Sequence, residues 1–130
     1  MTERSDRVGA GVLDTIGHTP IVRLQRLVSP DSAVVWVKLE ANNPTGSCKD
    51  RMALAMIEGA ERSGGLRPGQ TVVEYTGGST GSSLALIWVL KGYPLRIVSS
   101  DAFAQEKILT MRAFGARVEI IPSPKIPPRT

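Results

Sequence analysis

The sequence predicts an α/β fold in which a parallel sheet of about four strands is flanked by helices. Short runs rich in β-branched residues alternate with runs whose apolar residues recur every three or four positions. A glycine follows each of the helix-like runs, as is typical of helix ends. The length of 130 residues is sufficient for one compact domain with a core of its own, and the apolar share of 42% is ordinary for a globular protein.

The first half of the chain is predicted to contain two extended segments and one helix. Residues 21–24 form a short extended piece, and residues 33–40 form a strand because they are rich in β-branched and aromatic side chains. Residues 42–46, with the sequence Asn-Asn-Pro-Thr-Gly, are a strong loop signal. A helix is expected from after Ser47 to about Arg62, where a pair of glycines follows.

The second half is predicted to repeat the alternation as strand, glycine-rich turn, helix, strand, helix and strand. These segments are residues 71–75, 76–81, 82–91, 95–99, 105–114 and 117–121. Strands that alternate with helices of this length are typical of crossover connections, which make the sheet parallel.

The last residues differ in composition from the rest of the chain. Four of the nine residues from 122 to 130 are proline, which is compatible neither with a helix nor with a central strand. We therefore expect residues 123–130 to form a disordered tail behind a folded unit of residues 1–122.

Charge and composition favour a small anionic ligand as partner, rather than nucleic acid or a membrane. Sixteen Lys and Arg against twelve Asp and Glu give a net charge of +4, without the basic clusters and interleaved aromatics of nucleic-acid binding. The most apolar stretch, residues 84–90, is too short to span a bilayer. The single cysteine, Cys48, and a polar start at residues 1–7 predict a cytoplasmic protein. The single histidine, His18, leaves no histidine pair for a metal, so no metal is expected.

Residues 43–51 (the lysine loop, NPTGSCKDR) join a predicted strand to a predicted helix. Thr45 and Ser47 are candidate caps for that helix, and Asp50 stands in the first turn, where a carboxylate is favoured. Lys49 is the anomaly, because the helix dipole disfavours an ammonium there. The same field, with partial burial, favours an uncharged nucleophilic amine. A surface lysine that pairs with Asp50 or with solvent is an alternative that the spacing does not exclude.

The lysine loop resembles the cofactor-lysine motif of the cysteine synthase and cystathionine β-synthase family, the fold-type II pyridoxal-phosphate enzymes. Residues 15–24 (TIGHTPIVRL) resemble the opening of the same enzymes, where Asn more usually stands at His18. The resemblance covers about residues 10–122. It implies a tryptophan synthase β-like fold, pyridoxal 5'-phosphate held covalently by Lys49, and Lys49 as the catalytic base. It also implies β-replacement on an O-activated serine, as in cysteine biosynthesis. Cys48 stands where the family usually has an apolar residue, so we expect it to pack rather than react.

Residues 76–81 (the glycine loop, TGGSTG) follow a predicted strand and open a predicted helix, an arrangement that forms an anion site. The resemblance implies that this loop binds the carboxylate of an amino-acid substrate. The residues concerned are Thr76, Gly77, Gly78, Ser79 and Thr80. Ser79 stands where the family generally has an Asn that contacts the cofactor, so Ser79 is also a candidate cofactor ligand with a shorter reach.

Two alternatives remain for the glycine loop. It can be a mere helix start in which glycines permit tight packing. It can also belong to a dinucleotide site, with Asp101 as the acidic residue twenty positions beyond Gly81, although the full glycine spacing of that motif is not present.

Members of the resembled family are more than twice as long as this chain. Their phosphate-binding loop and the serine that contacts the ring nitrogen lie downstream of residue 130. We therefore expect a truncated chain, weakly active or inactive, whose arm at residues 1–26 packs on a second domain in the whole enzyme. Self-association, or pairing with a full-length subunit as a non-catalytic fragment, is the corresponding expectation for protein partners.

Overall fold

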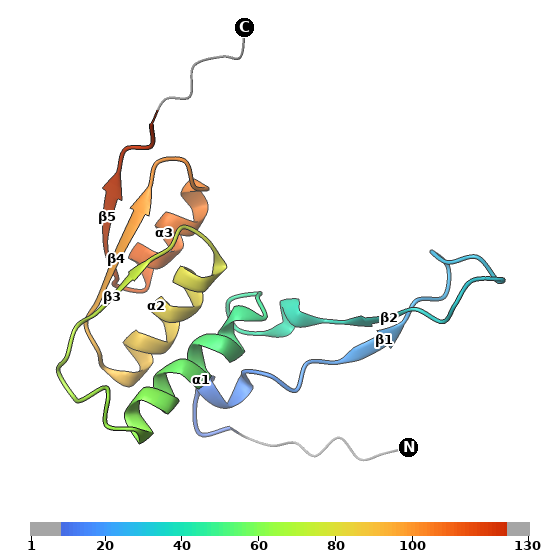
Figure 1. Cartoon of the computed structure of the whole chain (residues 1–130). Helices are drawn as coiled ribbons and strands as arrows, with labels where there is room; N and C mark the ends of the chain where they lie inside the picture. The colour runs from blue at the N-terminus through green and yellow to red at the C-terminus, as the bar shows by residue number, and fades with distance from the viewer. Residues whose placement is uncertain (1–8, 125–130) are drawn as a thin grey trace, which may run out of the picture.

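The structure, a computed structural model, describes residues 9–124 and consists of an α/β domain from which a two-stranded hairpin projects (Figure 1). Two short 3₁₀ helices, η1 (Val12–Thr15) and η2 (Glu40–Asn42), lie before and after the hairpin. The polar start at residues 1–7 and residues 125–130 of the expected tail lie outside the described residues.

The sheet of the domain is parallel, with the strand order β3-β4-β5. The strands are β3 (Val72–Tyr75), β4 (Leu95–Ser100) and β5 (Arg117–Ile121). All three were predicted from their β-branched runs, within one residue at each end. The α/β class and the parallel sheet with flanking helices are confirmed.

Three helices complete the domain: α1 (Lys49–Arg62), α2 (Ser79–Lys91) and α3 (Gln105–Ala113). Figure 1 shows α2 and α3 against one face of the sheet, and α1 packs against α2. Because α2 is enclosed by the sheet and both other helices, its residues from Gly81 to Trp88 are all buried.

The helices end where the sequence predicts, but one helix begins earlier than predicted. Gly92 ends α2 in the left-handed conformation, with φ of 76°, which glycine adopts without strain. Helix α2 begins at Ser79, three residues before the expected start at residue 82. The turn signal of the two adjacent glycines extended the predicted loop into the first helical turn.

The hairpin changes the expected strand count. Strand β1 (Ile21–Arg23) pairs antiparallel with β2 (Trp36–Lys38), and these two strands form a sheet of their own. The strand expected at residues 33–40 is thus shorter and lies outside the parallel sheet, which has three strands where about four were expected. A β-rich run predicts a strand but does not say which strand it pairs with.

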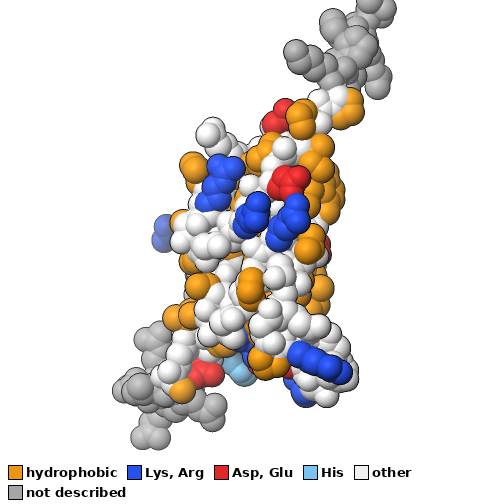
Figure 2. All heavy atoms as spheres, turned by 90° about the vertical axis from the view of Figure 1, so that its left-hand side faces the viewer, with side chains coloured by type: hydrophobic (Ala, Val, Ile, Leu, Met, Phe, Trp, Pro, Cys, Tyr) orange, Lys and Arg blue, Asp and Glu red, His pale blue; other side chains and the backbone are white. Residues whose placement is uncertain are grey.

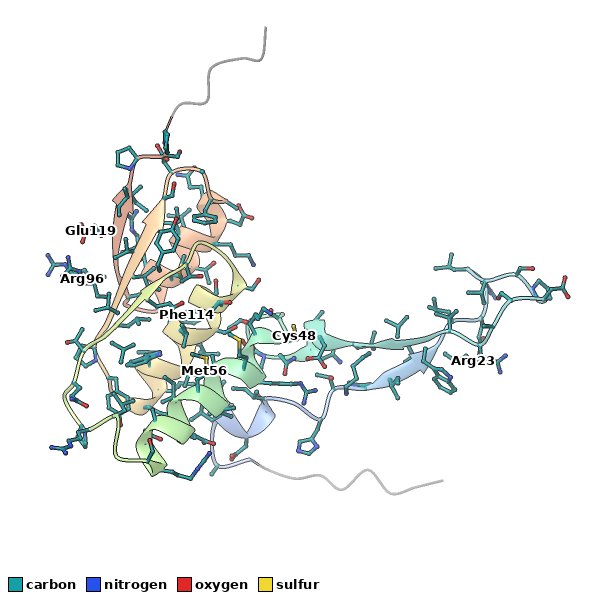
Figure 3. The ribbon with its side chains drawn as sticks, viewed as in Figure 1. Arg23, Cys48, Met56, Arg96, Phe114 and Glu119 are labelled. Carbon is teal, nitrogen blue, oxygen red and sulfur yellow. The ribbon has the colours of Figure 1, made fainter. Side chains whose placement is uncertain are left out.

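The face of the sheet opposite α2 and α3 is open to solvent, and Figure 2 shows it as a mixture of charged and hydrophobic side chains. Arg96 and Glu119 form an ion pair of 2.6 Å on this face, and both side chains point away from the helices (Figure 3). Tyr75 and Ile121 are exposed. Among residues 9–124, no helix is both long and apolar enough to cross a membrane.

Candidate active site

Lys49 is the first residue of α1 and its side chain is partly buried. The lysine loop turns into the helix just before it, where the Lys49 backbone N–H donates to Ser47 Oγ at 3.1 Å. Ser47 thus contacts the first N–H of the helix, but Cys48 is the N-cap residue and its side chain forms no cap, so the predicted cap is not found at Ser47. Cys48 precedes the helix and is exposed (Figure 3), so the expectation that it packs was wrong.

Other polar side chains of the lysine loop tie it to the segment before it. Asn43 Oδ1 accepts the Gly17 N–H at 2.8 Å, and Asn43 Nδ2 donates to the Glu40 carbonyl at 2.9 Å. Arg51 donates to Glu40 Oε1 at 3.0 Å and to Thr19 Oγ1 at 2.9 Å. Asn43 and Arg51 thus fix the backbone on either side of Lys49.

The ion pair at this point has a clear electrostatic effect. Hydrogen bonds from Arg51, and then from Thr19 and Asn43, lower the pKa of Glu40 from 4.5 to about 2. The same hydrogen bond with Glu40 raises the pKa of Arg51. Glu40 therefore remains a carboxylate, and Arg51 a cation, at any pH where the protein is expected to work.

Asp50, the neighbour of Lys49, is fully buried and binds Thr45. Asp50 Oδ2 accepts the Thr45 N–H at 2.8 Å, and Oδ1 accepts the Thr45 hydroxyl. The expected cap at Thr45 is instead a donor to this carboxylate. No ion pair among residues 9–124 includes Lys49, so pairing between Lys49 and Asp50 is not found in the structure.

The glycine loop connects β3 to α2 and is held by close packing. A Cβ atom at Gly77 would lie 1.9 Å from Phe103 Cγ, and one at Gly81 would lie 2.4 Å from Met111 Sδ. Only glycine allows the backbone to approach these side chains. Gly78 is the N-cap of α2 and no side chain caps this helix, so its first N–H groups are open to an anion.

The structure brings the lysine loop close to helix α2. Thr45 Oγ1 lies 3.2 Å from Ser83 Oγ, in the second turn of α2. The lysine loop therefore lies beside the helix that the glycine loop opens. A hollow of about 400 Å³ at the carboxyl ends of the strands is lined by Tyr75 and Phe103, but not by Lys49.

Two other residues singled out in the sequence have structural explanations. His18 is exposed with φ of 48°, a left-handed turn conformation that Asn adopts more readily than His. Asp101 accepts the Ser123 N–H at 2.7 Å, and hydrogen bonds from Ser123 lower its pKa. The dinucleotide alternative thus gains no support, since Asp101 is engaged within the chain. The described residues hold no cluster of three His, Cys, Asp or Glu that could bind a metal.

The sequence did not predict three contributors to this region. Glu40 and Ser83 are distant in sequence from their partners Arg51 and Thr45, and Phe103 lies in a loop. One signal was available for Ser83, because two serines at 82 and 83 open an otherwise apolar run. Such polar residues at the start of a buried helix indicate hydrogen bonds to another element, which Ser83 forms, whereas Ser82 Oγ has no partner among the described residues.

Comparison with known proteins identifies relatives along most of the chain. Residues 12–126 match the family described as pyridoxal-phosphate dependent enzyme. Cysteine synthase B of Salmonella typhimurium is 49% identical over 107 residues, which are 82% of this chain and 35% of that protein.

Solved structures agree with the sequence relatives. The crystal structure of O-ureido-L-serine synthase is 43% identical with a TM-score of 0.83, over 89% of this chain and 36% of that one. A hydrogen sulfide-producing enzyme from Fusobacterium nucleatum is 39% identical with a TM-score of 0.85, over 90% and 38% of the two chains. The chain thus spans little more than a third of the length of the proteins it matches.

Proposed function

Since this chain belongs to the pyridoxal-phosphate dependent enzyme family, we propose that it supplies the lysine-bearing part of a cysteine synthase-like β-replacement enzyme. One observation carries the proposal. Asn43, Asp50 and Arg51 all form hydrogen bonds that shape the lysine loop, whereas Lys49 between them takes part in no ion pair of the described residues. A rigid loop that presents one uncommitted amine is what covalent attachment of a carbonyl cofactor requires.

The described residues fit pyridoxal phosphate at the points they can contact. Lys49 offers a partly buried amine at the start of α1, and Ser79 offers a hydroxyl at the start of α2. The hydrogen bond between Thr45 and Ser83 places these helices side by side. When bound, the cofactor supplies an electron sink for the carbon atoms of an amino-acid substrate.

The protein's own groups then have separate tasks. Lys49 would hold the cofactor through its amine, and the same amine would take the proton from the substrate Cα. The loop from Thr76 to Thr80 binds the substrate carboxylate with the open N–H groups that begin α2. Ser79 donates a hydrogen bond toward the cofactor. These positions orient Cα toward the lysine amine.

The substrate in this proposal is a serine whose hydroxyl carries an activating group. With the Cα proton on the lysine amine, the activating group leaves from Cβ; a sulfur nucleophile then adds at Cβ and the proton returns to Cα. Elimination followed by addition makes the reaction both a lyase and a transferase step in cysteine biosynthesis. Relatives whose names specify cysteine synthesis and O-ureido-L-serine synthesis support this substrate class. The cytoplasmic location stays a prediction.

The arm at residues 1–26 enters the hairpin through strand β1, and the exposed apolar side chains of this hairpin support the further proposal that the arm packs on a second domain. Leu27 at its tip is 86% exposed and Trp36 in β2 is 57% exposed, and Ile21, Val34 and Val35 are exposed as well. Such an apolar surface on a projecting hairpin is typical of an interface. The same surface favours the alternative that the chain pairs with a full-length subunit without catalysing the reaction itself. Copurification with such a subunit would support this alternative.

We expect the 130-residue chain alone to bind the cofactor weakly and to turn over little substrate. The relatives extend over nearly three times the matched length, and a lysine and a carboxylate loop do not orient the cofactor ring by themselves. Rapid β-replacement by the purified chain would contradict this expectation.

Visible absorbance tests the proposal itself. Added pyridoxal phosphate should acquire the absorbance of a lysine adduct with the native chain, and this absorbance should be lost in Lys49→Ala. Lys107→Ala is the matched control, because Lys107 lies on α3 and is also partly buried. Equal absorbance in the native chain and in Lys49→Ala would exclude Lys49 as the cofactor lysine.

A further inference from the structure

A chain of hydrogen bonds whose two end residues are buried joins the lysine loop to helix α2. Thr45 contacts Asp50 through both its N–H, at 2.8 Å, and its hydroxyl, and the same hydroxyl lies 3.2 Å from Ser83 Oγ. Asp50 and Ser83 are both fully buried. Among the hydrogen bonds of the described residues, the one between Thr45 and Ser83 is the only one that joins the lysine loop to α2.

The chemistry of the three groups sets the direction of these bonds. A carboxylate only accepts hydrogen bonds, so the Thr45 hydroxyl donates its proton to Asp50. The Ser83 hydroxyl must then donate to the lone pair that remains on Thr45 Oγ1. The chain runs from Ser83 through Thr45 to Asp50, and each bond polarises the next, because its two end groups are fully buried.

The two ends of this chain lie beside the two groups that a substrate must reach. Asp50 follows Lys49 in the first turn of α1, and Ser83 lies three residues after Thr80, the end of the predicted carboxylate site. The carboxylate and Cα of an amino acid are separated by one bond. The amine of Lys49 and the carboxylate site must therefore keep a fixed separation.

Apolar packing between α1 and α2 does not fix this separation alone. Ala53 and Ile57 of α1 belong to the same buried core as Leu84 and Trp88 of α2. Apolar contacts have no preferred direction. The ion pair of Lys91 with Glu61 at 2.8 Å also joins the two helices, but it lies at their last turns, whereas Lys49 and the glycine loop lie at their first turns. A buried hydrogen bond has a preferred length and angle, and an unpaired Ser83 or Thr45 is costly.

We propose that Thr45 and Ser83 are positioning residues that hold Lys49 at a fixed distance from the glycine loop. The catalytic meaning of that distance rests on the proposed function. The link itself is a property of these buried side chains and is measurable without cofactor.

The single cysteine makes the measurement direct. Cys48 is exposed and adjacent to Lys49, so a nitroxide spin label attached there reports on the position of the lysine loop. Paramagnetic broadening of the amide signals of Gly77, Gly78 and Ser79 then measures the distance between the two loops in the 130-residue chain.

Thr45→Val removes the hydroxyl and keeps the shape of the side chain. We expect the broadening at the glycine loop to change by about 1.5-fold, which corresponds to a displacement of about 1 Å. Thr45→Ser restores the hydroxyl and should restore the native broadening. Ser83→Ala should reproduce the change seen in Thr45→Val, and it serves as the second variant if Thr45→Val does not fold.

A variant that weakens the fold elsewhere separates positioning from stability. Ile97→Val shortens a fully buried side chain in β4, outside both loops and without a polar group, and should cost about 1 kcal/mol of stability without altering the broadening. Native broadening in folded Thr45→Val and Ser83→Ala would overturn the proposal. Failure of Lys49 to bind the cofactor would contradict the proposed function, but the broadening would still show whether Thr45 and Ser83 position the lysine loop.

Discussion

The lysine loop and the glycine loop both connect a strand or 3₁₀ segment to a helix, but they are held in different ways. The lysine loop is fixed by polar side chains, chiefly Asn43, Asp50 and Arg51, which bond to backbone and side-chain groups around it. The glycine loop is fixed by the absence of side chains, because Phe103 and Met111 fill the space that Cβ atoms would need.

The difference follows from what each loop presents. The lysine loop offers a side chain, so its other polar groups can be used for structure while Lys49 stays uncommitted. The glycine loop offers backbone N–H groups, which must stay open at the start of α2. Hydrogen bonds to these groups would block the site, so packing holds the loop instead.

The largest effect on stability is expected when the hydrogen bonds that hold the lysine loop are removed. Asp50→Ala leaves the Thr45 N–H and hydroxyl without their buried acceptor, which should lower the free energy of unfolding by about 3 kcal/mol. Lys49→Ala, one residue away, should change it by no more than about 0.5 kcal/mol. Urea unfolding of both variants measures the contrast, and equal losses would mean that Asp50 is not part of a scaffold.

A smaller effect on stability is expected when a Cβ atom is added in the glycine loop. Gly81→Ala places a Cβ atom 2.4 Å from Met111 Sδ and 2.7 Å from Thr76 Cγ2. The overpacking should cost about 2 kcal/mol. The control is Gly59→Ala in α1, where the nearest atom is 4.0 Å away, on Arg62. This change should stabilise the protein by about 0.5 kcal/mol through helix propensity. A stabilising Gly81→Ala would contradict the packing account.

Gly77 gives a finer test, because its neighbour Phe103 is not buried. Gly77→Ala should cost about 1 kcal/mol, since the Phe103 ring is partly exposed and is able to move aside. In the double variant with Phe103→Ala, the Gly77→Ala change should cost almost nothing. Thermal unfolding of the four proteins gives the coupling between the two residues. Additive effects would show that the ring does not constrain Gly77.

The smallest effect on stability is expected when low pH protonates Glu40 in its partly exposed ion pair with Arg51. The pKa of Glu40 is about 2 in the folded protein, below its ordinary value of 4.5. Its stabilising contribution is therefore complete above about pH 4.5 and is lost as the pH falls toward 2. Glu40→Gln should be less stable than the native chain at pH 6, and the difference should shrink between pH 5 and pH 2. A constant difference across this range would rule out the ion pair as its cause.

The comparison also explains what the sequence could and could not predict. The ends of the helices were predictable because Gly92 and Gly115 adopt left-handed backbone, a local property of glycine. The separate hairpin was not predictable, because the β-branched run at residues 33–40 predicts a strand but not the strand with which it pairs. The bond between Thr45 and Ser83 joins residues 38 positions apart and depends on how α1 packs on α2.

Lys49 shows most clearly which parts of the site the sequence could predict and which it could not. Its position at a helix start was predictable from the loop signal before it, and its family role followed from the resemblance of nine residues. The sequence could not show that Asp50 turns inward to Thr45 rather than pairing with Lys49.

Chemical trapping compares Lys49 directly with the other lysines of the described chain. Lys91 is ion-paired to Glu61 at 2.8 Å, and Lys38 donates to the Thr19 carbonyl, so both amines are engaged. After pyridoxal phosphate is added and borohydride reduces the adducts, peptide mapping should find most of the label on Lys49. Label shared evenly among Lys38, Lys49, Lys91 and Lys107 would contradict the proposal that Lys49 is the cofactor lysine.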